Sequence, residues 1–464
     1  MLLVLCTGFF MILLDTTVVN IAIPSMIEGL HASLDQILWV LNGYILVYAV
    51  LLITAGRLGD LYGQRNVFAV GLVVFTAASA YCGLAPDVLH LQIARVIQGT
   101  GGALLTPQTL AILTSIFPAD RRGAAFGVWG GVAGIATVAG PTLGGYLVAD
   151  WGWRSIFYLN VPIGILALVA TFVVIPDMRQ GRKHRLDVIG VALATAGLFA
   201  IVFGLIEGQR FQWGTIWGPI TIPSMLGAGV GVLALFILWE RRQAEPLMPL
   251  SLFRSRNFAI MNWIAVVVSF GMFGLFLPIT IYLQSVLGLS ALHAGLTIAP
   301  MSLVSMVVAP LAGRFSDKIG GKYILFVGCI IVVLGIGSLV LLAGPAVSPV
   351  RFLPSFAVAG LGMGMVFSPM ATVAMRNVSP TMAGAASGVF NSFRQLGGVI
   401  GSSVVGAILQ AQLARSSEFV QALRPSLAVP MAIMLLGAFS TLLIERRKRA
   451  RPAVAAPETL AMAS

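Results

Sequence analysis

Two related ten-residue stretches mark the chain, GRLGDLYGQR at residues 56–65 and GRFSDKIGGK at residues 313–322. Both keep Gly, Arg, Asp, Gly and a terminal cation in register, 257 positions apart. A second pair, GAAFGVWG at 123–130 and GAASGVFN at 384–391, recurs 261 positions apart. Because two unrelated stretches give nearly the same offset, the sequence indicates an internal repeat.

The composition around these repeats is that of an integral membrane protein. Of the 464 residues, 58% are hydrophobic and only 9% are charged, whereas soluble domains carry about 25% charged residues. Cys6, Cys82 and Cys329 lie in apolar runs without metal-binding spacing, so we expect neither a disulfide framework nor a metal site. The net charge of +12 does not predict nucleic-acid binding, because the cations cluster in short loops between apolar segments.

Apolar runs of membrane-crossing length recur along the whole chain. A crossing needs about 20 such residues, and this length predicts fourteen helices, near 2–23, 36–57, 66–85, 88–116, 122–149, 155–175, 188–207, 219–239, 258–284, 294–313, 323–343, 351–375, 385–412 and 425–444. With the N-terminus inside, 21 of the 28 Lys and Arg fall in inside loops and 5 outside, while Arg95 and Arg394 lie within spans. This asymmetry predicts that both termini are cytoplasmic.

The repeat divides these fourteen helices unequally. A repeat distance of about 260 residues exceeds the six helices of residues 1–175 by some 80 residues, enough for two more helices. We therefore predict an all-α fold with an N-terminal six-helix bundle (1–175), two inserted helices with basic loops (176–257), a C-terminal six-helix bundle (258–444) and a basic cytoplasmic tail (445–464). Both copies of the first motif fall in cytoplasmic loops, so the repeats are expected to be parallel.

These motifs resemble those of a known group, the fourteen-helix drug/proton antiporters of the major facilitator superfamily. The stretch 56–65 is similar to the superfamily's loop signature, with Gly56, Asp60, Gly63 and Arg65 on its key positions. RVIQGTGGA at 95–103 resembles the helix 4 signature, AGPTLGG at 139–145 the helix 5 antiporter signature, and LDTTVVNIAIP at 14–24 the opening of the fourteen-helix branch. The resemblance covers nearly the whole chain and implies export of small molecules.

Asp15 is the only acid near the middle of a predicted span. Intramembrane ionisable residues are costly and are functional candidates by default. A buried carboxyl group can gain and lose a proton as an opposing cation approaches and withdraws, and Arg95 is the expected partner. The resemblance also implies a proton-transfer role for this arginine. The alternative is a static ion pair that only fixes helix packing.

The loop motif predicts a cytoplasmic gate. Asp60 lies where a loop meets a helix, with Arg57 and Arg65 beside it, and could close this side through the cations and a helix N-terminus. Asp317 is the equivalent residue in the second repeat and is a weaker candidate. In members of the family, such contacts are usually stronger in the first half of the chain. An equally open alternative is a plain helix cap that marks topology.

Further residues are predicted to line a substrate cavity or to shape its wall. The glycines of the fifth span allow close helix packing and its proline allows bending, although ordinary small-residue packing is an equal alternative. Aromatic side chains favour a lipophilic substrate held mainly by apolar contact. The predicted cavity residues are Asn20, Gln98, Phe273, Phe276, Tyr282, Asn391 and Arg394, and the predicted antiporter-helix residues are Gly140, Pro141, Gly144 and Gly145.

These features together predict a secondary transporter. The phosphate-binding pattern G-x-x-x-x-G-K-[ST] does not occur, so a proton gradient rather than ATP is the expected energy source. We predict a monomeric proton-coupled exporter of amphipathic drugs or metabolites in the plasma (inner) membrane, with a lipophilic substrate, protons and the lipid bilayer as partners and no cofactor or metal. A transporter on the same fold that is dedicated to the uptake or the export of one metabolite is the nearer alternative. A membrane-embedded enzyme is disfavoured, since no catalytic cluster falls within the spans.

Overall fold

A computed structural model describes residues 1–118, 121–177, 185–415 and 418–445. The predicted basic tail beyond residue 445 and the loop cations of 178–184 lie outside the described residues.

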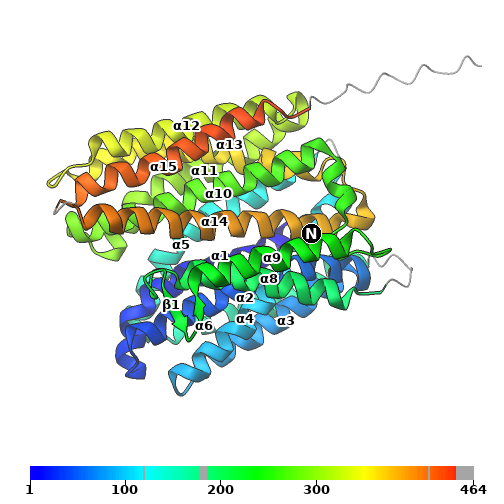
Figure 1. The fold of residues 1–464 in the computed structure, drawn as a ribbon, viewed down its shortest axis with the longest axis horizontal. Helices are drawn as coiled ribbons and strands as arrows, with labels where there is room; N and C mark the ends of the chain where they lie inside the picture. Colours follow the sequence, from blue (N-terminus) through cyan, green and yellow to red (C-terminus); the bar gives the residue numbers. More distant parts are fainter. Residues whose placement is uncertain (119–120, 178–184, 416–417, 446–464) are drawn as a thin grey trace, which may run out of the picture.

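The described chain is almost entirely helical (Figure 1). In sequence order the elements are α1 (Leu2–Leu30), α2 (Leu34–Tyr62), α3 (Gln64–Leu84), α4 (Val88–Ile116), α5 (Arg122–Trp151), α6 (Ser155–Tyr158), α7 (Asn160–Val174), α8 (Val188–Glu207), β1 (Thr215–Trp217), β2 (Ile220–Thr221), α9 (Ile222–Glu240), η1 (Leu250–Arg254), α10 (Arg256–Ile281), η2 (Tyr282–Val286), α11 (Ala291–Ile319), α12 (Lys322–Leu342), η3 (Pro349–Phe352), α13 (Leu353–Met375), η4 (Pro380–Met382), α14 (Ala383–Leu413) and α15 (Phe419–Thr441).

Thirteen helices of the described chain are long and apolar enough to cross a membrane. The remaining predicted crossing, 88–116, forms the 29-residue helix α4, which is not among the thirteen. Its polar residues, which include Arg95, Gln98 and Gln108, lower its hydropathy, and all three are buried inside the protein. The sequence also did not predict the antiparallel hairpin of β1 and β2 between α8 and α9.

Local sequence explains where the helices begin and end. Ser33 starts α2 with a capping box that includes Gln36, because the two side chains satisfy backbone N–H groups that no helical carbonyl can reach. Gly63 ends α2 and Gly320 ends α11, with φ angles of 89° and 85°. Only glycine adopts this backbone region without strain, which explains why both copies of the repeated loop motif carry a glycine there.

The helices form two groups that lie side by side (Figure 1). We call α1–α7 the N-terminal half and α10–α15 the C-terminal half. Contacts between the halves are made by α5 with α11 and α13, and by α14 with α2 and α4. These contacts place α5 and α14, which carry the second repeated motif, at the centre of the molecule.

Helices α8 and α9 pack against each other, and α8 also contacts α2 and α14. Two polar contacts fix this position. Glu207, which is only 3% exposed, binds Arg210 at 3.2 Å and accepts a hydrogen bond from Asn42 of α2 at 3.4 Å. The Ser403 hydroxyl of α14 donates to the carbonyl of Leu205 at 2.8 Å.

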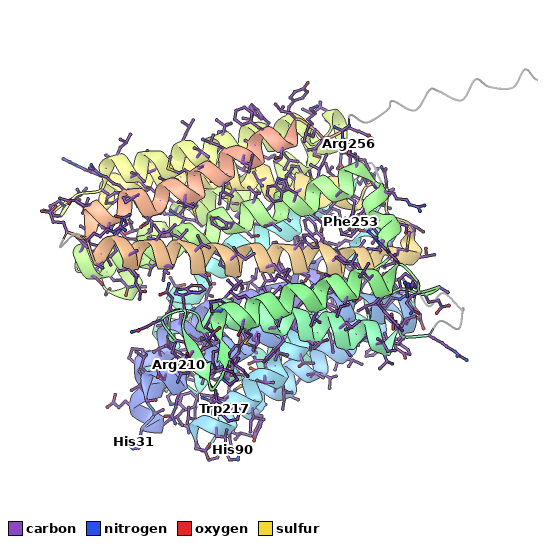
Figure 2. The ribbon with its side chains drawn as sticks, in the orientation of Figure 1. His31, His90, Arg210, Trp217, Phe253 and Arg256 are labelled. Carbon is purple, nitrogen blue, oxygen red and sulfur yellow. The ribbon has the colours of Figure 1, made fainter. Side chains whose placement is uncertain are left out.

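The two ends of the helix bundle differ in charge. One end carries the last residues of α2, α9 and α11 and the first residues of α5, α10 and α14, and we call it the basic end because Arg57, Arg122, Arg241, Arg254 and Arg256 lie there. Figure 2 labels Arg256 at this end and His31, His90, Arg210 and Trp217 at the opposite end.

Candidate functional site

Asp15 lies at the middle of α1 and is 3% exposed. One carboxylate oxygen accepts a hydrogen bond from the Arg95 guanidinium of α4 and forms an ion pair with it. The other accepts from the Gln98 amide at 3.0 Å and from the Asn160 amide at 3.3 Å. The structure therefore brings together the two residues predicted for proton coupling, and adds Gln98 and Asn160 to them.

Arg95 is held on all sides. Its Nη1 also donates to the Gln98 side-chain oxygen at 2.7 Å, and its Nε donates to the carbonyl of Val40 in α2 at 3.1 Å. The guanidinium carbon lies 4.2 Å from the centre of the Tyr44 ring, a cation–π arrangement. The arginine is 1% exposed, so its charge is balanced inside the protein by Asp15.

A second layer of polar groups surrounds the pair. The Asn160 amide also donates to the Ser79 hydroxyl at 3.2 Å, and that hydroxyl donates to the Phe157 carbonyl at 2.8 Å. The Cys82 thiol lies 3.6 Å from the Gln98 oxygen. We call Asp15, Arg95, Gln98, Asn160 and Ser79 the buried polar network. It is built from α1, α3, α4 and α7, so it lies wholly within the N-terminal half.

The ion pair of Asp15 and Arg95 limits how Asp15 can take up a proton. Removing one partner from a buried ion pair leaves an uncompensated charge and costs about 3–5 kcal/mol. A proton added to Asp15 would cancel its charge and leave Arg95 unbalanced. Protonation of Asp15 and the position of Arg95 must therefore be coupled.

The glycines predicted for the antiporter helix lie against α1 next to Asp15. A Cβ atom on Gly144 would meet Val18 at 3.0 Å, and one on Gly140 would overlap Thr17. The Thr17 hydroxyl lies 3.4 Å from the Ala136 carbonyl of α5. Gly145 faces open space, and the Pro141 side chain lies outside the described parts. Gly140 and Gly144 thus couple α5 closely to the helix that carries Asp15.

Asp60 binds the N-terminus of a helix in the other half. Its two carboxylate oxygens accept hydrogen bonds from the backbone N–H groups of Gly384 and Ala385 at 2.7 and 2.8 Å. These groups open α14, where unpaired N–H groups and the helix dipole favour a negative charge. These two bonds link the halves at the basic end, because each joins residues that are more than 300 positions apart in the sequence.

Asp317 makes the equivalent contact in reverse. Its oxygens accept from the N–H groups of Gly123 at 2.9 Å and Ala124 at 3.1 Å, at the start of α5. The Ser368 hydroxyl adds a bond to the Gly123 carbonyl at 3.0 Å. Each copy of the first repeated motif therefore binds the second repeated motif of the opposite half, and the structure gives Asp317 the same type of contact as Asp60.

Glycine is required where these contacts form. A Cβ atom on Gly384 would meet the Asp60 Oδ1 atom at 2.6 Å, and one on Gly123 would meet the Asp317 Oδ1 atom at 2.5 Å. Any side chain there would displace the carboxylates. This explains why the glycine that opens GAAFGVWG and GAASGVFN recurs.

The two predicted gate cations occupy different positions. Arg57 is 8% exposed and lies close enough to Asp60 to interact with its charge. Arg65 instead binds Asp177 at 3.2 Å and the Ile175 carbonyl at 3.3 Å, at the end of α7. The expectation that Arg65 acts beside Asp60 is therefore corrected, because Gly63 turns the chain so that Arg65 joins α3.

The three aromatic residues predicted for the cavity lie in the C-terminal half, in different surroundings. Tyr282 is 1% exposed, and its hydroxyl donates to the Gly344 carbonyl at 2.7 Å at the outer end of the C-terminal half. Phe273 is 47% exposed and packs over Gly398. Phe276 lines a small apolar pocket within the C-terminal half, formed also by Met272, Leu275, Met301, Val332, Ile336, Ala359 and Met363. The Tyr282 ring packs against the rings of Phe352 and Phe419.

Polar residues predicted for the cavity divide between the halves. Asn20 is exposed one turn beyond Asp15, with its amide bonded to the Thr16 carbonyl of its own helix. Asn391 is fully buried, and its amide donates to the Ser387 carbonyl at 2.9 Å. Arg394 is partly buried and lies over the Trp129 ring, with 5.8 Å between the guanidinium carbon and the ring centre.

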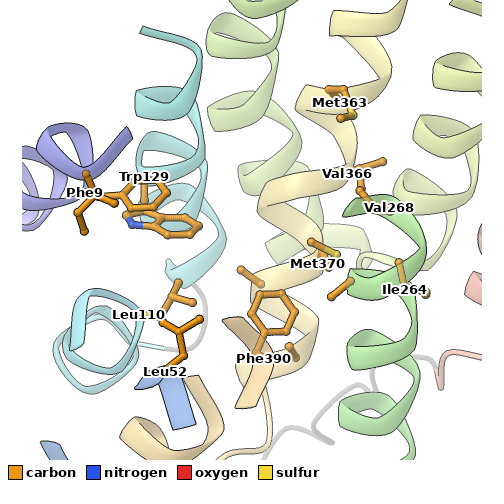
Figure 3. Close-up of a cluster of buried hydrophobic side chains, with 14 of the residues drawn as sticks. Phe9, Leu52, Leu110, Trp129, Ile264, Val268, Met363, Val366, Met370 and Phe390 are labelled. Carbon is orange, nitrogen blue, oxygen red and sulfur yellow. The ribbon is translucent and has the colours of Figure 1, made fainter. Parts of the chain in front are cut away.

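The centre of the molecule on the basic side of Arg394 is filled. Figure 3 shows Phe9, Trp129, Leu52 and Leu110 of the N-terminal half next to Phe390 and Met370 of the C-terminal half. Phe9 and Trp129 stack with their ring centres 4.2 Å apart. Together with the two carboxylate contacts, this cluster blocks the space between the halves near the basic end.

Sequence reasoning missed Asn160, Ser79 and Ser368, because an amide or hydroxyl group in or beside an apolar span carries no distinctive signal. Asn160 lies in the stretch WGWRSIFYLNVP at residues 151–162, where its neighbours are mostly apolar or aromatic. Among the described residues, no group of three or more His, Cys, Asp or Glu could hold a metal ion.

Known proteins are similar over nearly the whole chain. Residues 5–402 match the family model of the Major Facilitator Superfamily. The chain is 37% identical to the "Tetracenomycin C resistance and export protein" of Streptomyces glaucescens and to the "Multidrug resistance protein Stp" of Mycobacterium tuberculosis (strain CDC 1551 / Oshkosh), in each case over 89% of this chain and 76% of the relative. The solved structure of the human organic anion transporter MFSD10 (TETRAN) has the same fold, with a TM-score of 0.68, 14% identity and coverage of 95% of this chain and 98% of that one.

These matches agree with the helical architecture and the repeated loop motif described above. The chain is a multi-pass membrane protein that belongs to the Major Facilitator Superfamily.

Proposed function

We propose that the chain is a proton-coupled exporter of amphipathic drugs or metabolites, of the fourteen-helix drug/proton antiporter type. The observation that carries the proposal is the buried ion pair of Asp15 and Arg95 within the polar network. It supports proton coupling because a mid-membrane carboxylate of this kind is costly unless it is used. The relatives named for resistance and export support the outward direction.

In the proposed cycle, Asp15 exchanges its proton for substrate. With the site open to the cytoplasm, substrate binds while Asp15 is ionised and paired with Arg95. With the site open to the outside, a proton reaches Asp15, Arg95 is released from the pair, and substrate leaves. Protons moving inward drive the cycle with about 1.4 kcal/mol per pH unit and about 2.3 kcal/mol per 100 mV.

The two halves would rock as rigid bundles about the central interface. We assign residues 1–175 and 258–444 to the two bundles and treat α8 and α9 as an inserted pair. Asp60 and Asp317 act as the gate, since each must release the helix N-terminus of the opposite half before the basic end opens. In this reading the structure corresponds to a state closed at the basic end.

The basic end is proposed to face the cytoplasm, because cations concentrate on the inner side of membrane proteins. Both termini then lie inside, and α4 completes a count of fourteen crossings. We propose that the protein works as a monomer in the plasma (inner) membrane.

The test is proton release from detergent-solubilised protein in weak buffer when a panel of lipophilic compounds is added. Compounds that bind should release protons from the unmodified protein and should bind without release to the Asp15→Asn variant. Equal proton release from the two proteins would contradict the assignment of Asp15.

A transporter dedicated to one metabolite on the same fold is the second candidate, favoured by the relative that is named for a single antibiotic. Competition among chemically unrelated compounds for one binding site separates the two. Broad competition supports a multidrug exporter, whereas binding of one compound only supports the dedicated transporter.

A further inference from the structure

Arg95 and Arg394, the two arginines within predicted spans, differ in whether a carboxylate balances their charge. Arg394 lies eleven residues into α14 from the basic end, which is about 16 Å along the helix and close to the middle of a 30 Å hydrocarbon core. Arg95 is balanced by Asp15. Within the described chain, no carboxylate lies within 4 Å of the Arg394 guanidinium.

Two groups of the described chain face Arg394 from the opposite half, and neither of them is an anion. Trp129 of α5 lies under the guanidinium, with 5.8 Å between the guanidinium carbon and the ring centre, and the Tyr48 hydroxyl of α2 lies close enough to interact with its charge. That hydroxyl lies 3.0 Å from the Thr106 hydroxyl of α4. A guanidinium has five N–H donors, and these neighbours use only some of them.

A buried polar atom without a partner lies beside the arginine. Trp129 is 2% exposed, and its Nε1 atom has no hydrogen-bond partner in the described structure. A buried N–H group is normally satisfied by protein, water or ligand. Trp129 also stacks on Phe9, so the site offers a cation, an N–H donor and a flat apolar surface together.

We propose that Arg394 binds an anionic group of the transported molecule, and that the substrates are amphipathic organic anions with an aromatic or similarly flat apolar body. The proposal rests on the exporter function and names its substrate class. Arg394 takes the carboxylate, sulfonate or phenolate, since charged groups at this depth pair with an opposite charge or line a watery path. The apolar body lies near Trp129 and Phe9.

The charge balance explains why an anion is preferred to a cation. Asp15 and Arg95 cancel each other, and Asp15 is enclosed by the N-terminal half. Among the described residues within the spans at this depth, Arg394 carries a charge that no carboxylate within 4 Å balances. A lipophilic cation would meet this charge without compensation, whereas an anion would neutralise it.

The experiment compares two dyes that share a xanthene body, the anion fluorescein and the cation rhodamine 123. Binding is measured by fluorescence anisotropy on the purified full-length protein in detergent. We expect the unmodified protein to bind fluorescein at least tenfold more tightly than rhodamine 123. Equal affinity, tighter binding of rhodamine 123 or no binding of fluorescein would overturn the proposal, and this comparison needs no variant.

Variants of Arg394 test whether its charge binds the anionic group of the dye. Arg394→Gln should weaken fluorescein binding about tenfold or more, as expected for loss of a charge-assisted hydrogen bond, and should leave rhodamine 123 unchanged or bound more tightly. Arg394→Lys should keep most of the affinity for fluorescein, and Arg351→Gln, at an exposed position in η3, should keep all of it. An equal loss for both dyes with Arg394→Gln would show a structural role only and overturn the assignment.

Failure of this inference and failure of the exporter proposal give different results. If Asp15→Asn still transports fluorescein against its gradient while Arg394→Gln loses anion binding, proton coupling at Asp15 fails and the anion site stands. If Asp15→Asn abolishes gradient-driven transport while Arg394→Gln binds both dyes like the unmodified protein, the anion site fails and the exporter proposal stands.

Discussion

Arg95 has partners on several sides of its guanidinium. It bonds to Asp15, to the Gln98 oxygen and to the Val40 carbonyl, and it lies over the Tyr44 ring. Lysine keeps the positive charge but lacks the planar fork that serves several acceptors at once. Charge alone therefore cannot replace this residue.

We predict that Arg95→Lys lowers gradient-driven transport at least tenfold and destabilises the protein by about 2–4 kcal/mol, since buried acceptors lose their donors. Transport is measured in vesicles and stability by thermal unfolding in detergent. Arg351→Lys, which changes an exposed arginine, is the control and should behave like the unmodified protein. Full transport by Arg95→Lys would show that only the charge matters.

The gate acids allow a second prediction at this scale. Asp60→Asn removes the charge that faces the start of α14 and weakens both bonds to Gly384 and Ala385. These bonds are of the charge-assisted kind, so we expect the basic end to open more often, by about tenfold. The readout is the rate at which a thiol reagent labels a cysteine placed at Ser387, which is fully buried.

The matched control for this experiment is Asp87→Asn. Asp87 also caps a helix N-terminus, but that of its own half, through the His90 N–H group at 2.9 Å. Hydrogen bonds from the His90 backbone and ring hold the pKa of Asp87 below its usual range, so Asp87 is ionised at neutral pH. Faster labelling of both variants would mean that any lost cap loosens the protein, and would contradict a specific gate.

At the scale of helices, the contact between α5 and α11 depends on glycines. A Cβ atom on Gly127 would meet the Pro310 Cα atom at 2.5 Å and the Ala309 carbonyl oxygen at 2.7 Å, and one on Gly134 would meet the Ser302 carbonyl oxygen at 2.5 Å. These obstacles are backbone atoms, which cannot turn aside. The two helices therefore fit only with glycine at these positions.

We predict that Gly127→Ala destabilises the protein by about 1–3 kcal/mol, the usual cost of overpacking, and increases labelling at the Ser387 cysteine. Gly145→Ala in the same helix meets nothing within 4 Å and should be neutral or stabilising by up to about 1 kcal/mol, because alanine favours the helix. Thermal unfolding of the two variants side by side tests this. Equal destabilisation would mean that the backbone of α5, and not its contact with α11, is affected.

At the scale of the whole molecule, the crosswise contacts make the two ends mechanically dependent. Asp60 binds α14 from the N-terminal half, and Asp317 binds α5 from the C-terminal half. If the halves move as rigid bodies, opening the basic end must bring the opposite ends together.

Spin labels can test this dependence in the double variant Asp60→Asn/Asp317→Asn. Labels at Tyr62 and Ile319, both exposed at the basic end, should move apart. Labels at Glu28 and Val350, exposed at the opposite end, should approach each other by several ångströms. A change at one end only would refute rigid-body rocking.

The sequence predicted the helical membrane fold because apolar runs, basic loops and repeated motifs are strong signals. It also indicated Asp15 and Arg95, since charges are rare in the middle of spans. It could not reveal that the repeated motifs bind each other crosswise, because a repeat offset gives equivalence and not contact. It could not reveal the neighbours of Tyr282 and Arg65 either, because Phe352, Phe419 and Asp177 are distant from them in sequence.

The central claim is that proton movement through Asp15 drives transport, and fluorescein uptake into inside-out vesicles under an imposed pH gradient tests it most directly. We expect Asp15→Asn to lose at least nine-tenths of gradient-driven uptake and still to exchange fluorescein across the membrane at equal pH. The exposed-site variant Asp150→Asn should transport like the unmodified protein. Gradient-driven uptake by Asp15→Asn at the unmodified rate would contradict the account.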